Sequence, residues 1–296
     1  MKILITGKNG QVGQCLQLAL HAFPDVDVLA CGREELDITD SLAVQKVVCN
    51  YKPDVIINAA AYTAVDKAES EQSLAYDINA TGPKNLAMAA KDIGSSIIHI
   101  STDYVFAGDH SDDYKEAEAT SPKSVYGQSK LAGEVAVAEV CERHVIIRTS
   151  WVFSEFGNNF VKTMLRLAKS NNSLNIVGDQ FGGPTYAGDI ASAILHIAFS
   201  LYNGNQAYGI YHFSGYPTVN WAEFAQAIFQ QAHTKGLIES AVVVNSIPTE
   251  QYPTPASRPK NSRLNCDKIY STFNVSASNW QAALKNISKY QKEIEK

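Results

Sequence analysis

Short apolar runs alternate with longer amphipathic stretches through the first half of the chain. The runs have the length and content of buried strands, and they lie at Lys2–Thr6, Asp27–Cys31, Asp54–Ala60, Ser95–Ser101 and His144–Thr149. The stretches between them have helical spacing, and they lie at Val12–Leu20, from an Asp37–Ser41 cap to about Tyr51, at Ser73–Ile93 with an irregularity at Gly82-Pro83, and around Tyr126 to about Cys141. This alternation predicts an α/β fold, a Rossmann-like doubly wound parallel sheet over residues 1–150.

Beyond Trp151 the alternation weakens and the linkers become richer in proline. Helices are predicted at Asn159–Lys169, Tyr186–Leu201, Trp221–Ala232 and Trp280–Lys292, and short strands near Leu174–Val177, Ile210–Phe213 and Val242–Val244. The segment Ile247–Asn265 holds too many prolines for a helix and is predicted to be an ordered or lid-like loop. We interpret residues 151–296 as mainly a smaller α/β substrate-binding lobe, interleaved with part of the Rossmann core.

Composition limits the class of partner. The chain has 296 residues, 45% of them hydrophobic and 19% charged, as in a globular protein of about two domains. A net charge of −5 argues against a nucleic-acid partner, which usually needs a basic face. No apolar run approaches the ~18 residues of a membrane span, and no cleavable signal precedes the first strand. Because its five cysteines also lack C-x-x-C spacing, we expect a cytoplasmic protein with reduced thiols and no membrane partner.

A glycine-rich turn follows the first predicted strand. Residues 2–13 read K-I-L-I-T-G-K-N-G-Q-V-G, with Gly7, Gly10 and Gly13 between a strand and a helix. Glycines let the backbone approach a pyrophosphate, and the helix N-terminus supplies free N–H groups and a favourable dipole. The spacing is G-x-x-G-x-x-G, and the alternative is an ordinary strand–helix turn. We predict a dinucleotide site here, with Gln11 and Val12 among its residues.

Tyr126 and Lys130 lie four residues apart on a predicted helix, and therefore on one of its faces. A free tyrosine titrates near pH ~10, and a nearby cation favours the phenolate and lowers that pKa. The pair can act as a tuned proton donor. A solvated helix face is the alternative for this spacing taken alone, and the glycine turn favours the catalytic interpretation.

Longer motifs extend the pattern over the chain. They are N-A-A-A-Y-T-A-V-D-K-A-E at Asn58–Glu69, S-T-D-Y-V-F at Ser101–Phe106, R-T-S-W-V-F at Arg148–Phe153, N-N-F-V-K-T-M-L-R-L at Asn158–Leu167, D-Q-F-G-G-P-T at Asp179–Thr185 and Y-P-T-P-A-S-R-P-K-N-S-R-L at Tyr252–Leu264. With them the chain resembles the extended short-chain dehydrogenase/reductase superfamily over essentially its whole length. Within that superfamily it resembles the dTDP-4-dehydrorhamnose reductase family, which the last two motifs indicate most narrowly.

The resemblance implies a mechanism. A reduced nicotinamide would deliver hydride to the C4 ketone of dTDP-4-dehydro-β-L-rhamnose, a nucleotide-sugar substrate, and Tyr126 would donate the proton. Lys130 would lower the tyrosine pKa and hold the nicotinamide ribose. Thr102 would hydrogen-bond the carbonyl or the phenol, and Asp103 would lie against the sugar. For Thr102 and Asp103, capping of the strand end is the alternative.

Cofactor preference depends on the end of the second strand. NAD-specific sites usually carry an acidic residue there, but this strand ends Ala30-Cys31-Gly32-Arg33. Arg33 can accept a 2′-phosphate, although it can equally be a solvated surface residue. We predict NADPH, with NADH tolerated. The resemblance also implies cofactor contacts at five further positions, which are Asp37, Ile38, Ala61, Tyr62 and Thr63.

The second lobe should bind the nucleotide half of the substrate. The resemblance implies that Trp151 faces the sugar and that Gln180 and Phe181 pair with and stack on the thymine. Arg258 and Arg263 suit a pyrophosphate, because guanidinium groups match phosphate oxygens. A core position for Trp151 and surface solvation for each arginine are the alternatives.

Two sister functions remain as alternatives. Sugar-nucleotide 4,6-dehydratases of the superfamily carry Asp-Glu after the threonine, whereas Tyr104 follows Asp103 here, which disfavours elimination. The beta subunit of methionine adenosyltransferase resembles these reductases and is a non-catalytic NADP-binding regulatory subunit. The intact Thr102, Tyr126 and Lys130 favour catalysis. A reductase of another 4-keto nucleotide sugar also stays open.

Some members of the reductase family bind Mg²⁺ at a dimer interface through glutamates, one of them just after the third glycine. This chain has Cys15 there, a poor ligand for a cation that prefers oxygen. The seven histidines show no metal-ligand spacing. We therefore predict no metal site, and a homodimer stays an open possibility.

Overall fold

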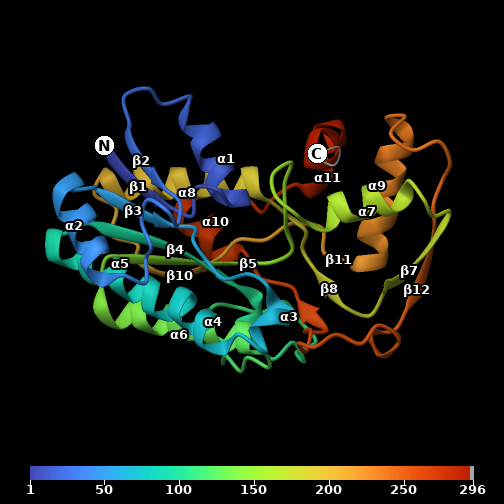
Figure 1. The fold of residues 1–296 in the computed structure, drawn as a ribbon, viewed down its shortest axis with the longest axis horizontal. Helices are drawn as coiled ribbons and strands as arrows, with labels where there is room; N and C mark the ends of the chain where they lie inside the picture. The colour runs from blue at the N-terminus through green and yellow to red at the C-terminus, as the bar shows by residue number, and fades with distance from the viewer. Residues whose placement is uncertain (294–296) are drawn as a thin grey trace.

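Six strands of the computed structural model, which describes residues 1–293, form one parallel sheet (Figure 1). Their order across the sheet is β10-β5-β4-β3-β1-β2, and every neighbouring pair is parallel. The strands are β1 (Lys2–Thr6), β2 (Asp27–Cys31), β3 (Val55–Asn58), β4 (Ser96–Thr102), β5 (His144–Thr149) and β10 (Gly209–His212). The predicted Rossmann-like parallel sheet is confirmed, and the first five strands lie within two residues of their predicted ends.

Helices cover both faces of this sheet (Figure 1). On one face lie α1 (Gln11–Leu20), α8 (Ala187–Tyr202) and α10 (Asp267–Phe273), and on the other lie α2 (Ser41–Tyr51), α5 (Gly82–Ile93) and α6 (Val125–Val140). Strand side chains alternate between the two cores: Ile3 and Ile5 pack with the first set of helices, and Leu4 packs with the second. Burial on both faces explains why the strands read as continuous apolar runs.

The second half of the chain contributes to this sheet. Strand β10 pairs with β5 along Gly209–His212, and Ile190 and Ile194 of α8 are fully buried in the same core as Leu16 of α1. Residues 187–212 therefore belong to the sheet layer, although they follow residues that lie outside it.

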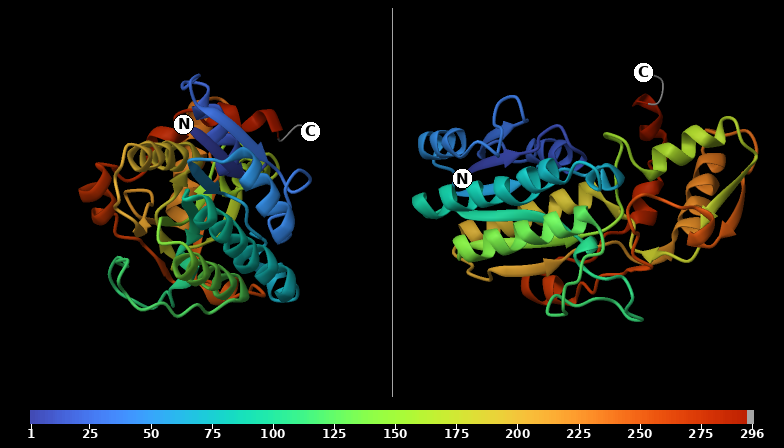
Figure 2. Two further views of the ribbon diagram at one scale, coloured as in Figure 1. Left: turned by 90° about the vertical axis from the view of Figure 1, so that its left-hand side faces the viewer. Right: turned by 60° about the horizontal axis from the view of Figure 1, so that its bottom comes forward.

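A separate apolar cluster holds the remaining elements together at one end of the sheet (Figure 2). Its helices are α7 (Phe160–Ala168), α9 (Trp221–Thr234), α11 (Trp280–Leu284) and the 3-10 helix Ile287–Glu293. Its short strands pair as β7 (Ser173–Val177) with β12 (Val243–Ile247), as β6 (Val152–Phe153) with β9 (Thr185–Tyr186), and as β8 (Phe181–Gly182) with β11 (Val219–Asn220) and β13 (Asn261–Ser262). Trp280, Tyr290 and Phe153 are among its largest buried side chains.

Two predicted elements differ in detail. The single helix predicted at Trp280–Lys292 is broken, because α11 ends at Leu284 and a 3-10 segment begins at Ile287. The predicted loop Ile247–Asn265 is mostly irregular, but it contains the 3-10 turn Thr249–Gln251 and strand β13.

The predicted irregularity near Gly82-Pro83 is a π-helical turn. The predicted stretch Ser73–Ile93 consists of α4 (Gln72–Tyr76), the π-helical turn η1 (Asp77–Thr81) and α5, and it is preceded by the short helix α3 (Val65–Ala68). Helix α6 packs tightly on this turn at Gly133, where an added Cβ would lie 2.0 Å from the carbonyl oxygen of Asn79. Since neither backbone can retreat from a fully packed core, this contact requires glycine.

We expect Gly133→Ala to lower the free energy of unfolding by about 2–4 kcal/mol, because the added methyl group overpacks the contact between α6 and η1. An ordinary helical Gly→Ala change is stabilising by about 1 kcal/mol. The measurement is urea unfolding followed by circular dichroism. Gln128→Ala on the exposed face of α6 is the control and should stay within about 0.5 kcal/mol of the wild type.

Candidate functional site

A cavity of ≈ 310 Å³ opens at the carboxyl ends of β1, β2 and β3. It is lined by Gly7, Gly10, Gly32, Arg33, Leu36, Asp37, Ile38, Ala59, Ala60, Ala61 and Ile78. The structure thus brings together six of the predicted cofactor residues, namely Gly7, Gly10, Arg33, Asp37, Ile38 and Ala61. Clefts at this edge of a doubly wound sheet are where nucleotides bind.

The glycine turn is built as a cradle for a phosphate group. Gly7 has a φ of +76°, and an added Cβ at Gly13 would lie 2.2 Å from the carbonyl oxygen of Gly7. Side chains at either position would close the turn. Gly10 precedes α1 and provides no side-chain cap, so the first N–H groups of the helix remain available to an anion. The residues present therefore fit the predicted dinucleotide.

Arg33 lies at the mouth of this cavity. Its side chain is 73% exposed and pairs with Asp37 at 3.7 Å between Nε and Oδ2. The backbone N–H and the hydroxyl of Thr39 donate hydrogen bonds to Asp37, and they lower the pKa of that carboxyl group. Asp37 therefore has its own partners, and the Arg33 guanidinium can turn toward a phosphate.

The side chain of Gln11 is used within the protein. Its Oε1 accepts hydrogen bonds from Ser154 Oγ at 3.0 Å and from Asn159 Nδ2 at 3.1 Å. Asn159 also caps α7 by accepting a bond from the N–H of Lys162. Gln11 thus ties the glycine turn to the second half of the chain, and its predicted cofactor contact rests on its backbone.

Asn79 is a site residue that the sequence motifs do not single out. It is fully buried on the π-helical turn, where its amide accepts a bond from the N–H of Tyr62 and donates to the Tyr62 carbonyl and to Ser129 Oγ. Asn79 thereby holds against α6 the loop that contains Tyr62 and Thr63, two of the predicted cofactor residues. A π-helical turn is itself a signal of a functional site, but it is visible only in the structure.

The catalytic candidates meet where α6 crosses the end of β4. Ser124 caps α6, and Tyr126 and Lys130 are both buried on the helix. Burial raises the pKa of Tyr126, and a hydrogen bond with Thr102 lowers it by less. The net direction is opposite to the lowering that we expected, because burial in a low-dielectric core disfavours the phenolate. The phenol therefore keeps its proton at neutral pH, but a raised pKa also makes it a weaker acid.

Lys130 lies behind this pair. Its Nζ donates a 2.6 Å hydrogen bond to the carbonyl of Ile100 on β4, and the side chain is 1% exposed. Burial lowers the pKa of Lys130 to about 8, and the negative charge of Glu134 works against that shift. That Lys130 lowers the pKa of Tyr126 stays a prediction.

Asp103 lies next to Thr102 and is also buried. Thr102 Oγ1 donates to Asp103 Oδ1 at 3.0 Å. Burial raises the pKa of Asp103 to about 6, and hydrogen bonds with Ser262 and Thr102 oppose that shift. Asp103 Oδ2 has no hydrogen-bond partner among the described residues. A buried acceptor without a partner fits a place beside a ligand hydroxyl group.

The arginines predicted for the pyrophosphate occupy different environments. Arg258 contacts Asp66 at 2.7 Å and the Tyr104 hydroxyl at 3.1 Å, and the Tyr104 ring packs edge-on against Tyr126. It therefore lies next to the catalytic candidates. Arg263 donates to the carbonyl of Ser111 and pairs with Asp113.

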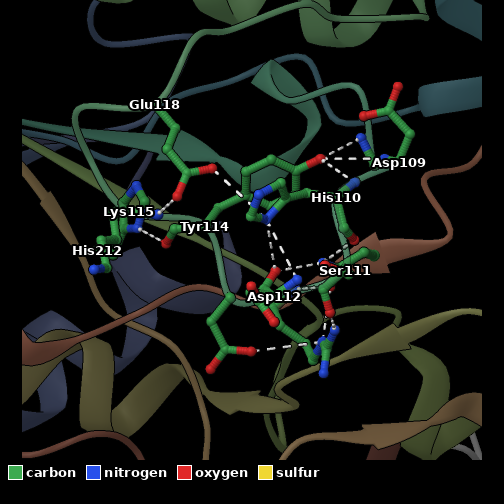
Figure 3. Close-up of polar contacts among 12 residues, drawn as sticks. Asp109, His110, Ser111, Asp112, Tyr114, Lys115, Glu118 and His212 are labelled. Atoms are coloured by element: carbon green, nitrogen blue, oxygen red, sulfur yellow. Dashed lines mark hydrogen bonds and ion pairs between the residues drawn. The ribbon is translucent and has the colours of Figure 1, made fainter.

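Arg263 contacts a loop around residues 109–114 whose backbone is held by several hydrogen bonds (Figure 3). The Tyr114 hydroxyl oxygen accepts bonds from three successive backbone N–H groups, those of Gly108, Asp109 and His110. Asn261 donates to the carbonyls of His110 and Asp112 from the other side. The contacts of Arg263 with Ser111 and Asp113 help to hold the same loop. Its binding to substrate stays a prediction.

The aromatic candidates are placed at the other side of the site. Trp151 has a φ of +48° and stacks on Trp221 with ring centroids 3.5 Å apart, so one of its faces is covered. Gln180 is buried and donates to Thr249 Oγ1 at 3.1 Å. Phe181 is 42% exposed and is the candidate with a free ring surface. Trp221 was missed because an aromatic residue at a helix start carries no functional signal.

The position of the family's metal ligand does not suit Mg²⁺. Burial raises the pKa of Cys15 to about 12, with smaller contributions from Glu155 and Asp189, so the thiol stays protonated. Asp189 Oδ2 accepts a 2.6 Å hydrogen bond from Ser278. Within residues 1–293, no group of three or more His, Cys, Asp or Glu side chains could hold a metal ion.

Comparisons over the whole chain agree with this geometry. Residues 1–292 match the family model described as the RmlD substrate binding domain. This chain belongs to that family. A dTDP-4-dehydrorhamnose reductase of Aggregatibacter actinomycetemcomitans is 50% identical over 290 residues, which cover 98% of this chain and 99% of the relative. The predicted family is therefore confirmed.

Solved structures of the family have the same fold. A dTDP-4-dehydrorhamnose reductase from Clostridium acetobutylicum aligns with a TM-score of 0.90 and 40% identity over 100% of both chains. A dTDP-4-dehydrorhamnose reductase from Bacillus anthracis, in complex with NADP, aligns with a TM-score of 0.89 and 38% identity over 100% of this chain and 99% of that one.

The raised pKa of Asp103 makes a prediction about stability. The stability that the folded protein gains by keeping this carboxyl group protonated is fully present below the unfolded pKa near ~4. It is lost as pH rises through the folded pKa of about 6. The wild type should therefore lose about 1–2 kcal/mol of unfolding free energy relative to Asp103→Asn between pH 5 and pH 8. The measurement is urea unfolding of both proteins at each pH. Asp109→Asn, in an exposed loop, is the control and should show no such difference.

Proposed function

We propose that this chain uses NADPH to reduce the C4 ketone of dTDP-4-dehydro-β-L-rhamnose to dTDP-L-rhamnose. The predicted oxidoreductase function and NAD(P)H-type cofactor are confirmed by the comparisons, since relatives at 43–50% identity are dTDP-4-dehydrorhamnose reductases and a reductase structure at 38% identity is in complex with NADP. The observation that carries the proposal is the junction of Thr102, Tyr126 and Lys130 at the sheet edge that also forms the glycine-lined cavity.

The residues act by holding and moving a proton. NADPH, when bound, supplies the hydride that reduces the ketone carbon. Tyr126 gives its proton to the oxygen on which charge develops, and the Thr102 hydroxyl group hydrogen-bonds the phenol or that oxygen. Lys130 would hold the nicotinamide ribose, and Asp103 would orient the sugar. A proton from solvent restores Tyr126, so one ketone, one hydride and one proton give one alcohol.

Elimination lacks its acid–base pair at this site. The position after Asp103 is Tyr104, whose pKa burial raises and whose hydroxyl accepts a hydrogen bond from Arg258. A neutral phenol that is already bonded to a cation cannot replace a second carboxylate. Reduction without dehydration therefore fits better.

A non-catalytic NADP-binding subunit is the second candidate. It would keep the glycine cradle but would not need Tyr126 bonded to Thr102 at the sheet edge. Oxidation of NADPH in the presence of the 4-keto sugar nucleotide separates the two functions. Parallel assays with other 4-keto nucleotide sugars test substrate preference.

The substrate-binding lobe is proposed to be the cluster around α7, α9 and α11, within residues 151–296. The exposed Phe181 supports stacking of a nucleobase, and Arg258 supports binding of the diphosphate, for which it would exchange its contact with Asp66. Trp151, which packs on Trp221, and Gln180, which donates a hydrogen bond to Thr249, would line the same part of the nucleotide site.

The site of action is proposed to be the cytoplasm, where NADPH and nucleotide sugars are made. All five cysteines are free, which supports a reducing compartment. Within the described residues, no helix is long and apolar enough to cross a membrane. A homodimer remains a prediction, to be measured by sedimentation.

Tyr126→Phe removes one hydroxyl group from the proposed donor. We expect kcat to fall by about 10²–10⁴, the usual contribution of a general acid, while NADPH affinity stays within a few-fold. The measurement is NADPH oxidation with dTDP-4-dehydro-β-L-rhamnose, beside fluorescence titration of NADPH. Tyr202→Phe, at an exposed position at the opposite edge of the sheet, is the control. Activity of Tyr126→Phe close to that of the wild type would remove Tyr126 from the mechanism.

Arg33→Ala tests the cofactor preference. If the guanidinium holds the 2′-phosphate, KM should rise about tenfold or more for NADPH and stay nearly unchanged for NADH, since a charge-assisted bond contributes about 1.5–3 kcal/mol. Arg166→Ala on α7, also exposed, controls for the loss of a surface charge. Equal effects on the two cofactors would make Arg33 a solvated surface residue.

A further inference from the structure

The face of α6 that carries Tyr126 and Lys130 continues for one more turn. Glu134 follows Lys130 by four residues, as Lys130 follows Tyr126, so the three side chains lie along one side of the helix. All three are buried, with Lys130 1% and Glu134 2% exposed. A buried carboxylate one turn from a buried ammonium is not used by the mechanism above and needs a physical reason.

Glu134 is held rigidly by β5. Arg148 donates from Nε to both carboxylate oxygens, at 3.0 and 3.2 Å, and from Nη2 to Oε2 at 2.7 Å. Arg148 in turn lies over the Phe106 ring, with its guanidinium carbon 5.0 Å from the ring centroid. The carboxylate therefore has one position and one orientation in the core.

The same strands locate Lys130. Arg148 is paired in register with Ser101 on β4, one residue beyond Ile100, whose carbonyl accepts the Lys130 bond. The Arg148–Glu134 contact thus fixes the height of α6 above β4 and β5. This height sets the distance from Lys130 to the Ile100 carbonyl on β4. Burial lowers the pKa of Lys130 to about 8, and the charge of Glu134 is the contribution that opposes this loss.

In the part of the chain that the structure describes, no other group around Lys130 can supply the negative charge that opposes the lowering of its pKa. His99 on β4 is fully buried and its pKa is well below 6.5, so it stays neutral, and Tyr126 keeps its proton. Asp103 is bonded to Thr102. His144, on β5, is bonded to the Cys141 carbonyl. The charged residues of the other elements that pack on α6 are exposed or half-buried, and they are Asp66, Lys67, Glu69, Glu71, Asp77, Lys84, Lys91 and Asp92.

We propose that Glu134, held by Arg148, is a positioning residue for Lys130 that keeps the buried ammonium charged and directed at the cofactor site. The proposal rests on the proposed role of Lys130 in cofactor binding. Its alternative is a purely structural one, in which the ion pair only fastens α6 to β5.

Substitution of the pair separates these two roles. Glu134→Gln removes the carboxylate but leaves Arg148 buried without its charge partner, which destabilises the fold. The double variant Glu134→Gln with Arg148→Met removes both charges, and such replacements often restore stability. Glu139→Gln, an exposed position on the same helix, is the control for charge.

The readouts are the affinity for NADPH, by fluorescence, and kcat/KM between pH 6 and pH 9.5, both as functions of pH. For the wild type we expect both to fall as pH rises through about 8, because Lys130 loses its proton. In Glu134→Gln the midpoint should move about one pH unit lower, because the carboxylate is lost while Arg148 keeps its charge. The double variant also loses the Arg148 cation, so its midpoint should lie between those of Glu134→Gln and the wild type, although its Tm recovers. Glu139→Gln should keep the wild-type midpoint.

A double variant that recovers both Tm and the wild-type midpoint would overturn the proposal and leave the pair a structural role. An unshifted midpoint in a folded Glu134→Gln protein would do the same. Because NADPH affinity is measured without substrate, a wild type that binds NADPH but does not reduce the ketone would refute the proposed function and leave this test intact.

Discussion

Burial of α6 against the parallel sheet is the constraint on which the site depends. The helix lies close enough to η1 for Gly133 to be required at Asn79, and it takes Tyr126 and Lys130 out of water. Burial then governs the chemistry, because it raises the pKa of the phenol and lowers the pKa of the ammonium. The site therefore combines a phenol that keeps its proton at neutral pH with an ammonium group that can lose its charge.

Such burial has to be offset by partners. Lys130 has the Ile100 carbonyl and the charge of Glu134, and Glu134 has the fork of Arg148. Asp103 is offset less completely, with one oxygen lacking a partner among the described residues. Polar groups left in this state are a common feature of sites that complete their bonding with a ligand.

Long-range contacts join the sheet to the second half of the chain. Arg258 contacts Asp66 across 192 residues of sequence, and Gln11 contacts Asn159 across 148. Both contacts begin at residues of the cofactor edge. The position of the second half of the chain is therefore set by the same edge of the sheet that forms the glycine-lined cavity.

The sequence by itself determined the five strands of the first half, their parallel arrangement and the glycine turn, because apolar runs and tight turns depend on local spacing. It also singled out Thr102, Tyr126 and Lys130 as candidate catalytic residues through two motifs of one family. Only the tertiary structure decided the direction of the Tyr126 pKa shift, the contacts of the Gln11 side chain with Ser154 and Asn159, and the hydrogen bonds of Asn79. Burial and pairing arise between segments distant in sequence, and no local pattern encodes them.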